Sequence, residues 1–532
     1  MSRRFSGAAL VCAVCAFIFS GCTRSDLPAD LVIINGAEPE SLDPAIVTGQ
    51  ADGRVALALF EGLTRYNPTD AAPVPGVAER WDISPDGKVY VFHLRSNAAW
   101  STGEPITAND FVYSWRRALD PVTASEYAGQ LFYVKNGEAY NTGKIQDPSQ
   151  VGVKAIDDRT LRVELAAPTP FFLDLCALQT LAAVPRQAIE RHGDRWLMVP
   201  PVPTSGAYQL VYWRVNDKIR LRKNSRYWDV ANTRSELVDL LPCINASTAL
   251  NLYETGAADV VWDKNLVPVE LLDLLLRRPD FHSYDFLGTY FYRYNVTRKP
   301  FADPRVRKAF ALVIDKKRIV EKITKGGEKI ASGFTPPGIP GYEPPEGVGF
   351  DPELARRYLA EAGFPDGKGF PPFHFLFDTT SKLQEQIAIE LQAMWQRELG
   401  LKADLRKLEW KTYLRAQGEL DFDLCRSSWI GDYNDPNTFL DMFMSNNGNN
   451  RTGWRSPQYD QLLREANAQL DPAARFRILQ NAETLLVREE VPIVPLYIYA
   501  GIEYYDSNRV QGIFPNLRAE HPLRAIRKVN PD

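Results

Sequence analysis

A carboxylate stands among aromatic residues in the stretch SSWIGDYNDP, which covers residues 427 to 436. Asp432 follows Trp429 by three positions and lies next to Tyr433. A carboxylate in this setting serves as a catalytic acid, a metal ligand or a receptor for a positive charge. The choice among these three roles depends on what the other residues of the chain provide.

Several sequence motifs of enzyme active sites are missing from the chain. It has no GxSxG nucleophile motif, no SxxK and no GxxxxGK[ST] phosphate loop. The histidines lie far apart and form no HExxH metal motif: His93, His192, His282, His374 and His521. We therefore predict that the protein is not an enzyme and that it binds no metal or cofactor.

The balance of charge argues against a nucleic-acid partner. The chain carries 62 Lys and Arg against 66 Asp and Glu, a formal charge of −4, with no long basic run. Binding to a phosphate backbone requires a clustered cationic face. With 45% apolar residues in a chain of 532, the composition is that of a globular protein with several domains.

Local patterns predict that strands and helices alternate before the carboxylate. Residues 31–34 (LVII) form an apolar run typical of a buried strand. SPDGK at 84–88 predicts a tight turn between two strands. Residues 56–66 read as a helix that runs into a turn, and 107–119 as a helix with apolar residues at helical spacing. These patterns therefore predict a chain of mixed α and β structure.

A helix and two strands lead up to Asp432. Ser381 and Gln384 form a capping box, and the apolar spacing that follows predicts a helix that ends at Gly400. Residues 401–405 alternate between apolar and charged, which predicts a strand. A second strand, from residue 421 to 429, ends at the aromatic stretch and presents the carboxylate at its end.

The N-terminus has the pattern of an export signal. Arg3 and Arg4 precede the apolar run GAALVCAVCAFIFS, which is shorter than the ~20 residues of a membrane span. The segment 1–21 resembles a bacterial lipoprotein signal peptide, which implies that Cys22 is lipid-modified after cleavage. A plain secretory signal that is cut elsewhere is the alternative.

Three other cysteines remain in the mature chain. Cys176, Cys243 and Cys425 are far apart in sequence and form no disulfide framework. We expect buried free thiols at these positions, while a single disulfide stays open as an alternative.

Several segments together resemble one family of binding proteins. The chain is similar to peptide-binding lipoproteins of the oligopeptide permease type, in family 5 of the extracytoplasmic solute-binding proteins of ABC importers. The matching segments follow one another along the chain: SLDP (41–44), LFEGLTRY (59–66), 78–121, TSGAYQL (204–210), 247–260, 299–320, WIGDYNDPNTFL (429–440) and HPLRAI (521–526).

The resemblance implies a fold with two lobes. It is the type II periplasmic-binding-protein fold of the α/β class, with an extra domain inserted in lobe I and a hinge between the lobes. The implied division is a signal peptide (1–21), the start of lobe I (22–48), an inserted domain II (49–182), a continuation of lobe I (183–290), lobe II or domain III (291–500) and the end of lobe I (501–532).

The resemblance also assigns the aromatic stretch to the ligand. Asp432 matches the carboxylate that receives the α-ammonium of a peptide, and the backbone at Ser428 and Ile430 matches a strand that pairs with the peptide main chain. A charge-assisted hydrogen bond of this kind contributes about 1.5–3 kcal/mol. The alternative for Asp432 is a side chain that caps the turn before Asp435.

Further residues match positions around the ligand in this family. Trp429 and Trp410 match aromatic pocket walls, and Arg426 and Arg415 match basic residues near the peptide. Ordinary core packing is the alternative for the tryptophans, and surface ion pairs for the arginines. The other matches are Tyr113, Tyr499, Glu38 and Gln384. Some family members have a histidine in place of the last of these, and its charged contact with the peptide carboxylate is missing here.

The family implies transport without chemistry. A monomer, held by lipid on Cys22 to a membrane of the periplasm or cell envelope, would capture short peptides and deliver them to a permease with ATPase subunits. The alternatives are other ligands in the same fold, such as dipeptides, murein peptides, nickel chelates or sugars, and a peptide-sensing or chaperone lipoprotein.

Overall fold

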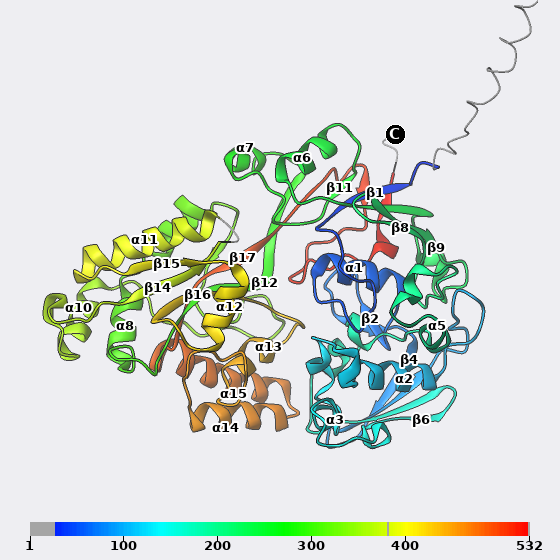
Figure 1. The fold of residues 1–532 in the computed structure, drawn as a ribbon, viewed down its shortest axis with the longest axis horizontal. Helices are drawn as coiled ribbons and strands as arrows, with labels where there is room; N and C mark the ends of the chain where they lie inside the picture. The colour runs from blue at the N-terminus through cyan, green and yellow to red at the C-terminus, as the bar shows by residue number, and fades with distance from the viewer. Residues whose placement is uncertain (1–26, 380–381, 530–532) are drawn as a thin grey trace, which may run out of the picture.

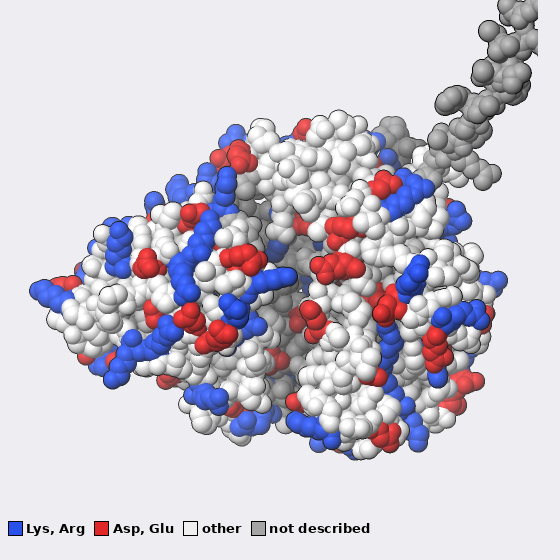
Figure 2. Space-filling view, viewed as in Figure 1, with Lys and Arg blue, Asp and Glu red and all other residues white. Residues whose placement is uncertain are grey.

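Two α/β bodies lie side by side in the computed structural model, which describes residues 27–379 and 382–529. Figure 1 shows that they are joined along one side by two long strands, β12 (Phe281–Tyr294) and β17 (Ile493–Tyr505). These two strands pair antiparallel to each other over most of their length. The space-filling view shows a cleft between the bodies, with acidic and basic side chains along its rims (Figure 2).

One sheet runs through both bodies. Within the described residues it has eleven strands, in the order β15 (Asp404–Leu408), β14 (His374–Asp378), β16 (Leu424–Ile430), β12, β17, β11 (Val260–Val261), β1 (Leu31–Gly36), β10 (Leu237–Pro242), β9 (Lys218–Lys223) and β8 (Tyr208–Arg214), with β13 (Lys329–Ile330) beside β17. The part from β11 to β8 belongs to the first body, and the part from β15 to β16 belongs to the second. The paired β12 and β17 therefore carry the sheet from one body to the other.

The first body also contains a small antiparallel sheet. Its order is β4 (Ala78–Ile83), β5 (Val89–Leu94), β7 (Thr160–Glu164) and β6 (Val153–Asp157). Gly87 adopts a φ of +67° in the tight turn between β4 and β5, so the hairpin predicted from SPDGK is confirmed. Helix α2 (Ala108–Leu119) packs against this sheet and starts in a capping box of Thr107 with Asp110.

The helices of the second body surround β14, β15 and β16 (Figure 1). They are α8 (Pro304–Leu312), α9 (Lys316–Arg318), α10 (Pro352–Glu361), α11 (Lys382–Leu399), α12 (Trp410–Gly418), α13 (Asn437–Leu440), α14 (Pro457–Ala468) and α15 (Pro472–Thr484). Gly400 follows α11 with a φ of +70°, as its predicted role of C-terminal cap requires. Ser381, half of the predicted capping box, lies outside the described residues.

Short elements complete the chain. The remaining helices are α1 (Gln50–Leu59), α3 (Gly137–Asn141), α4 (Phe172–Leu175), α5 (Arg186–His192), α6 (Ala246–Glu254) and α7 (Leu272–Leu275), and the remaining strands are β2 (Thr64–Tyr66), β3 (Pro73–Pro75), β18 (Val510–Gln511) and β19 (Arg527–Lys528). The helix expected over 56–66 thus ends at residue 59 and is followed by a strand. The strand expected from 401 begins three residues later.

The strand crossings bear on the expected domain division. The borders expected at 290/291 and 500/501 fall inside β12 and β17. The small sheet of the first body, with α2, falls inside the expected insertion 49–182. We keep the division into lobes and an inserted domain as a proposal, and we use the names lobe I, inserted domain and lobe II in this sense below.

The cysteines of the described part are free. Cys176 and Cys425 are buried and Cys243 is half-buried. The expectation of free thiols is thus confirmed for all three cysteines, and the expectation that they are buried is confirmed for two of them. Cys22 lies outside the described residues. No helix in the described ranges is both long enough and apolar enough to cross a membrane.

Candidate functional site

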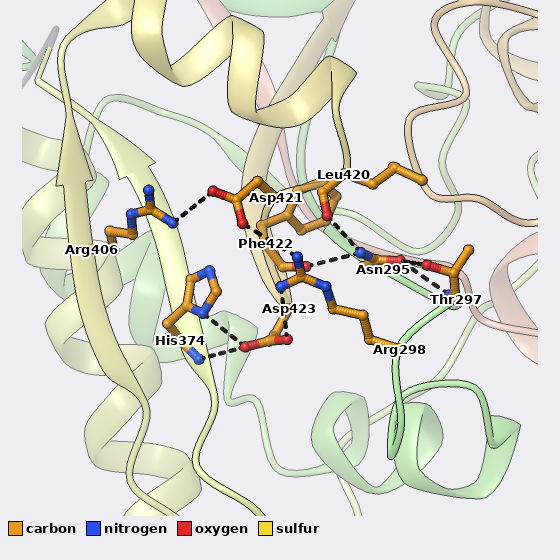
Figure 3. A network of polar contacts seen from close by, with 9 residues as sticks. All are labelled: Asn295, Thr297, Arg298, His374, Arg406, Leu420, Asp421, Phe422 and Asp423. Atoms are coloured by element: carbon orange, nitrogen blue, oxygen red, sulfur yellow. Dashed lines mark hydrogen bonds and ion pairs between the residues drawn. The ribbon is translucent and has the colours of Figure 1, made fainter.

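Polar contacts fix the start of β16, the strand that leads to Asp432 (Figure 3). The Nδ2 amide of Asn295 donates to the carbonyl oxygens of Leu420, at 2.8 Å, and Phe422, at 3.1 Å. Nδ1 of His374 on β14 lies 2.8 Å from a carboxylate oxygen of Asp423. The strand is therefore tied to the end of β12 and to β14 at the point where it begins.

One backbone edge of β16 becomes free as the strand approaches Asp432. On one side β16 pairs antiparallel with β12 as far as Ile430, which lies opposite Gly288. On the other side its parallel pairing with β14, within the part of the chain that the structure describes, ends at Cys425. The backbone of Ser428, Trp429 and Ile430 thus has a strand on one side alone. Such an edge can accept an extended chain as an added strand.

Asp432 lies two residues beyond the end of β16 and is half-buried. Its Oδ2 accepts a hydrogen bond of 3.2 Å from Nε2 of Gln130, and its carbonyl oxygen accepts one from the guanidinium of Arg518. Burial raises the pKa of the Asp432 carboxyl, while Arg518 and the hydrogen bonds of Gln130 and Tyr127 oppose the rise. In the described ranges no cation forms an ion pair with this carboxylate. It can therefore receive a positive charge from outside.

The turn after Asp432 is held by a different carboxylate. Oδ1 of Asp435 accepts from the backbone N–H of Asn437 at 2.9 Å, and both carboxylate oxygens of Asp435 pair with the Arg475 guanidinium at 2.6 and 2.8 Å. Since this residue caps the turn, the alternative role considered for Asp432 is filled by its neighbour.

The loop of Asp432 touches the inserted domain across the cleft. Tyr433 stacks on Phe171, with ring centroids 4.3 Å apart and planes 9° apart. The hydroxyl of Tyr133 donates to Oδ2 of Asp441 at 3.2 Å, close to the contact between Gln130 and Asp432. The two bodies therefore meet at the loop that carries the unpaired carboxylate.

A basic and aromatic cluster lies near the start of the free edge. Arg426 is 7% exposed, and its Nε lies 2.8 Å from Oδ2 of Asp378. Its guanidinium faces the rings of Tyr290, Trp410 and Tyr413 at 5.7 to 6.0 Å. This arginine is thus held by a buried partner, so the surface ion pair considered as an alternative does not describe it.

Two more expected residues join this cluster. The hydroxyl of Tyr290 donates to Oε1 of Gln384 at 2.8 Å, and its ring lies edge-on to Tyr499 with centroids 6.4 Å apart. The structure therefore brings five of the expected residues together: Trp410, Arg426, Ser428, Gln384 and Tyr499. Trp429 follows on the same strand, where its indole N–H donates to the carbonyl oxygen of Thr438 at 2.6 Å and steadies the Asp432 loop.

Three expected residues lie in other surroundings. Tyr113 sits in a hollow of the inserted domain with the Arg186 guanidinium 5.4 Å from its ring centre. Glu38 accepts from the indole N–H of Trp213 at 2.6 Å, on the far hairpin of lobe I. Arg415 is exposed on α12, on the solvent side of the helix. No contact of the described residues joins these three to the cluster or to Asp432, and their role at the ligand stays a prediction.

The structure adds site residues that sequence reasoning missed. Gln130 and Tyr127 come from the inserted domain, about 300 positions before Asp432, and no local pattern marks them. Tyr290 belongs to a run rich in aromatic residues that forms β12, where it lies opposite Ser428 of β16. Among the described residues, no group of three or more His, Cys, Asp or Glu side chains is placed to hold a metal ion.

Two lobes linked by crossing strands form the type II periplasmic-binding fold expected from the sequence. A family model described as "bacterial extracellular solute-binding proteins, family 5 Middle" matches residues 72–451. The chain belongs to this family of solute-binding proteins.

Known proteins resemble the chain over almost its full length. The periplasmic oligopeptide-binding protein OppA of Salmonella typhimurium is 38% identical over 91% of both chains. The periplasmic murein peptide-binding protein MppA of Escherichia coli is 37% identical over 87% of this chain and 86% of its own. A crystal structure of an OppAIV from Borrelia burgdorferi has a TM-score of 0.80 at 32% identity, covering 94% of this chain and all of the other.

Proposed function

We propose that the protein is the extracytoplasmic peptide-binding component of an ABC importer. It captures short peptides in the cleft between its lobes, with the ligand's α-ammonium on Asp432. The observation that carries this proposal is the free edge of β16, which runs through Ser428 and Ile430 and leads to a half-buried carboxylate without an ion-pair partner in the described ranges. The names of the relatives support peptides as the ligand class.

A strand edge beside a carboxylate suits ligands that vary in sequence. All unblocked peptides share an α-ammonium and a main chain of N–H and C=O groups. The edge of β16 pairs with the main chain whatever the side chains are. Asp432 pairs with the ammonium, a charge-assisted contact that strengthens when the closing lobes exclude water.

The residues at the other end of the edge face the rest of the ligand. Arg426 offers a cation for a ligand carboxylate, directly or through water. Trp410, Trp429 and Tyr499 form aromatic walls, and Gln384 adds a neutral polar group. Tyr113, Glu38 and Arg415 belong to the proposed site by family resemblance.

Closure of the lobes is proposed to trap the ligand. Contacts such as Tyr433 on Phe171 lie between lobe II and the inserted domain, so they can strengthen as a ligand bridges the cleft. The closed protein then docks on a membrane permease with ATPase subunits. The chain acts as a monomer, attached by lipid on Cys22 to a membrane of the periplasm or cell envelope, and carries out no catalysis.

A related ligand is the second candidate. One relative is named for murein peptides, so the cleft can be expected to hold a short peptide of that kind in place of linear oligopeptides. Native mass spectrometry of the purified protein separates these possibilities, because the masses of co-purified ligands report both class and length.

Thermal unfolding with defined ligands tests the proposed function. A tripeptide with a free amino terminus is expected to raise the Tm by mass action, and its N-acetylated form to raise it far less. Equal stabilisation by both peptides would remove Asp432 from its role, and the absence of any shift over a panel of peptides would contradict peptide binding itself.

A further inference from the structure

Lys264 is a residue of lobe I whose ammonium group contacts the two strands that link the lobes. It follows the end of β11 by three residues and is half-buried. Its Nζ lies 4.2 Å from the centre of the Tyr499 ring on β17 and 4.4 Å from that of the Phe286 ring on β12. A side chain of lobe I thereby contacts both of the strands that join the two lobes.

The ammonium of Lys264 has aromatic neighbours in place of an anion. In the ranges 27–379 and 382–529 no carboxylate lies within ion-pair distance of its Nζ, whereas the nearby Lys329 pairs with Asp285 at 2.6 Å. Burial lowers the pKa of Lys264 to about 8, and the more distant Asp263 and Glu328 oppose this without cancelling it. A half-buried cation of this kind gains from an incoming anion.

Gly288 connects Lys264 with the free edge of β16. A Cβ at this glycine would lie 2.5 Å from Cδ1 of Ile430, 3.2 Å from Tyr499 and 3.3 Å from Phe286, so three side chains meet over it. Lys264 rests on two of these three. Its ammonium and Ile430, the last residue of the edge with which we propose the ligand pairs, therefore share two aromatic neighbours.

The position along the edge sets the distance to the ligand's amino terminus. Ile430 precedes Asp432 by two residues, which corresponds to roughly 7 Å of extended chain. A group of the ligand that reaches Lys264 is therefore two to three residues away from the ammonium held by Asp432. Arg426 lies four residues further back on β16, roughly 13 Å along the strand, and serves a more distant part of a longer ligand.

We propose that Lys264 binds a carboxylate of the ligand that is two to three residues from its α-ammonium. This carboxylate is the C-terminus of a di- or tripeptide, or an acidic side chain at the second or third position of a longer peptide. The inference rests on the proposed function and adds a substrate class to it: peptides with a negative charge at this spacing. Asp432 then binds the ammonium of the ligand and Lys264 binds its carboxylate.

Calorimetric titration with matched ligands tests this inference. The ligands are trialanine and its C-terminal amide, and the pentapeptides AEAAA and AQAAA. A charge-assisted contact corresponds to roughly 10- to 150-fold in affinity, so the wild type is expected to prefer the acid in at least one pair by about this factor. A preference within the tripeptides identifies the terminal carboxylate, and one within the pentapeptides the side chain.

Variants of Lys264 test whether this lysine causes the preference for the acidic ligand of each pair. In Lys264→Met, or in Lys264→Gln should the first variant unfold, the ratio of the affinities for the acidic and the neutral ligand is expected to be close to one. Lys264→Arg is expected to restore most of the preference for the acidic ligand. Lys329→Met removes a nearby lysine that already has a partner and is expected to leave the ratio unchanged. Equal ratios in wild type and Lys264→Met, with peptides still bound, would overturn the inference while the proposed function stands. No peptide bound to the wild type would overturn both.

Discussion

Replacing Asp432 by asparagine separates charge from shape at the proposed ammonium site. Asparagine keeps an Oδ1 acceptor for Gln130 and leaves the backbone contacts of the loop in place. The variant loses the negative charge that would pair with the ligand. One charge-assisted hydrogen bond contributes about 1.5–3 kcal/mol, so the affinity for a free tripeptide should fall roughly 10- to 150-fold.

The same substitution should stabilise the protein without ligand. Burial raises the pKa of the Asp432 carboxyl, because the charged form loses hydration in the folded protein. A neutral amide avoids this cost, so the Tm of the ligand-free variant is expected to be equal to or above that of the wild type at pH 7. The two measurements, stability and affinity, thus move in opposite directions.

Calorimetry with two ligands completes this test. The free tripeptide should lose affinity in Asp432→Asn, while its N-acetylated form should bind wild type and variant alike. A variant in which both ligands weaken by the same factor would show that the loop has merely been disturbed. Unchanged affinity for the free tripeptide would refute the assignment of the ammonium to this carboxylate.

Three further substitutions test the architecture around the site. Gly288→Ala places a Cβ 2.5 Å from Ile430 and should cost roughly 1–3 kcal/mol in urea unfolding, while Gly129→Ala, which meets no atom within 4 Å, serves as control. Burial raises the pKa of the Asp441 carboxyl to about 7, so the folded protein keeps this proton at pH values where the unfolded chain has released it. The stability of the folded state should therefore fall as the pH rises from about 4 to 7. Asp441→Asn should flatten this dependence of Tm on pH, and an unchanged dependence would contradict the prediction. Tyr433→Ala removes the stacked ring between the lobes and should increase the radius of gyration of the ligand-free protein in X-ray scattering, whereas an unaltered value would mean that this contact does not hold the lobes.

Local features of the fold could be predicted because they depend on neighbouring residues. The turn of Gly87 and the cap at Gly400 each follow from a few adjacent side chains, and both are present in the structure. The long strand β12 was harder to recognise, since it is buried on both faces from residue 286 onward and shows no alternation of apolar and polar residues.

The same distinction between neighbouring and distant residues applies to the candidate site. Asp432 could be proposed from the sequence because it lies in a continuous motif, residues 429–440, that matches a family. Gln130 could not, because it reaches Asp432 from another domain, 302 residues away in sequence. Arg415 is exposed on α12, because Tyr413, Ala416 and Gln417 occupy the buried face of that helix, and its place beside the ligand stays a prediction.

A crystal structure with a bound tripeptide measures the central claim most directly. We predict that the ligand's α-ammonium lies within hydrogen-bonding distance of the Asp432 carboxylate, in a closed cleft, with the peptide main chain paired along Ser428 to Ile430. An ammonium held by other groups, with the Asp432 carboxylate turned to open water, would contradict it.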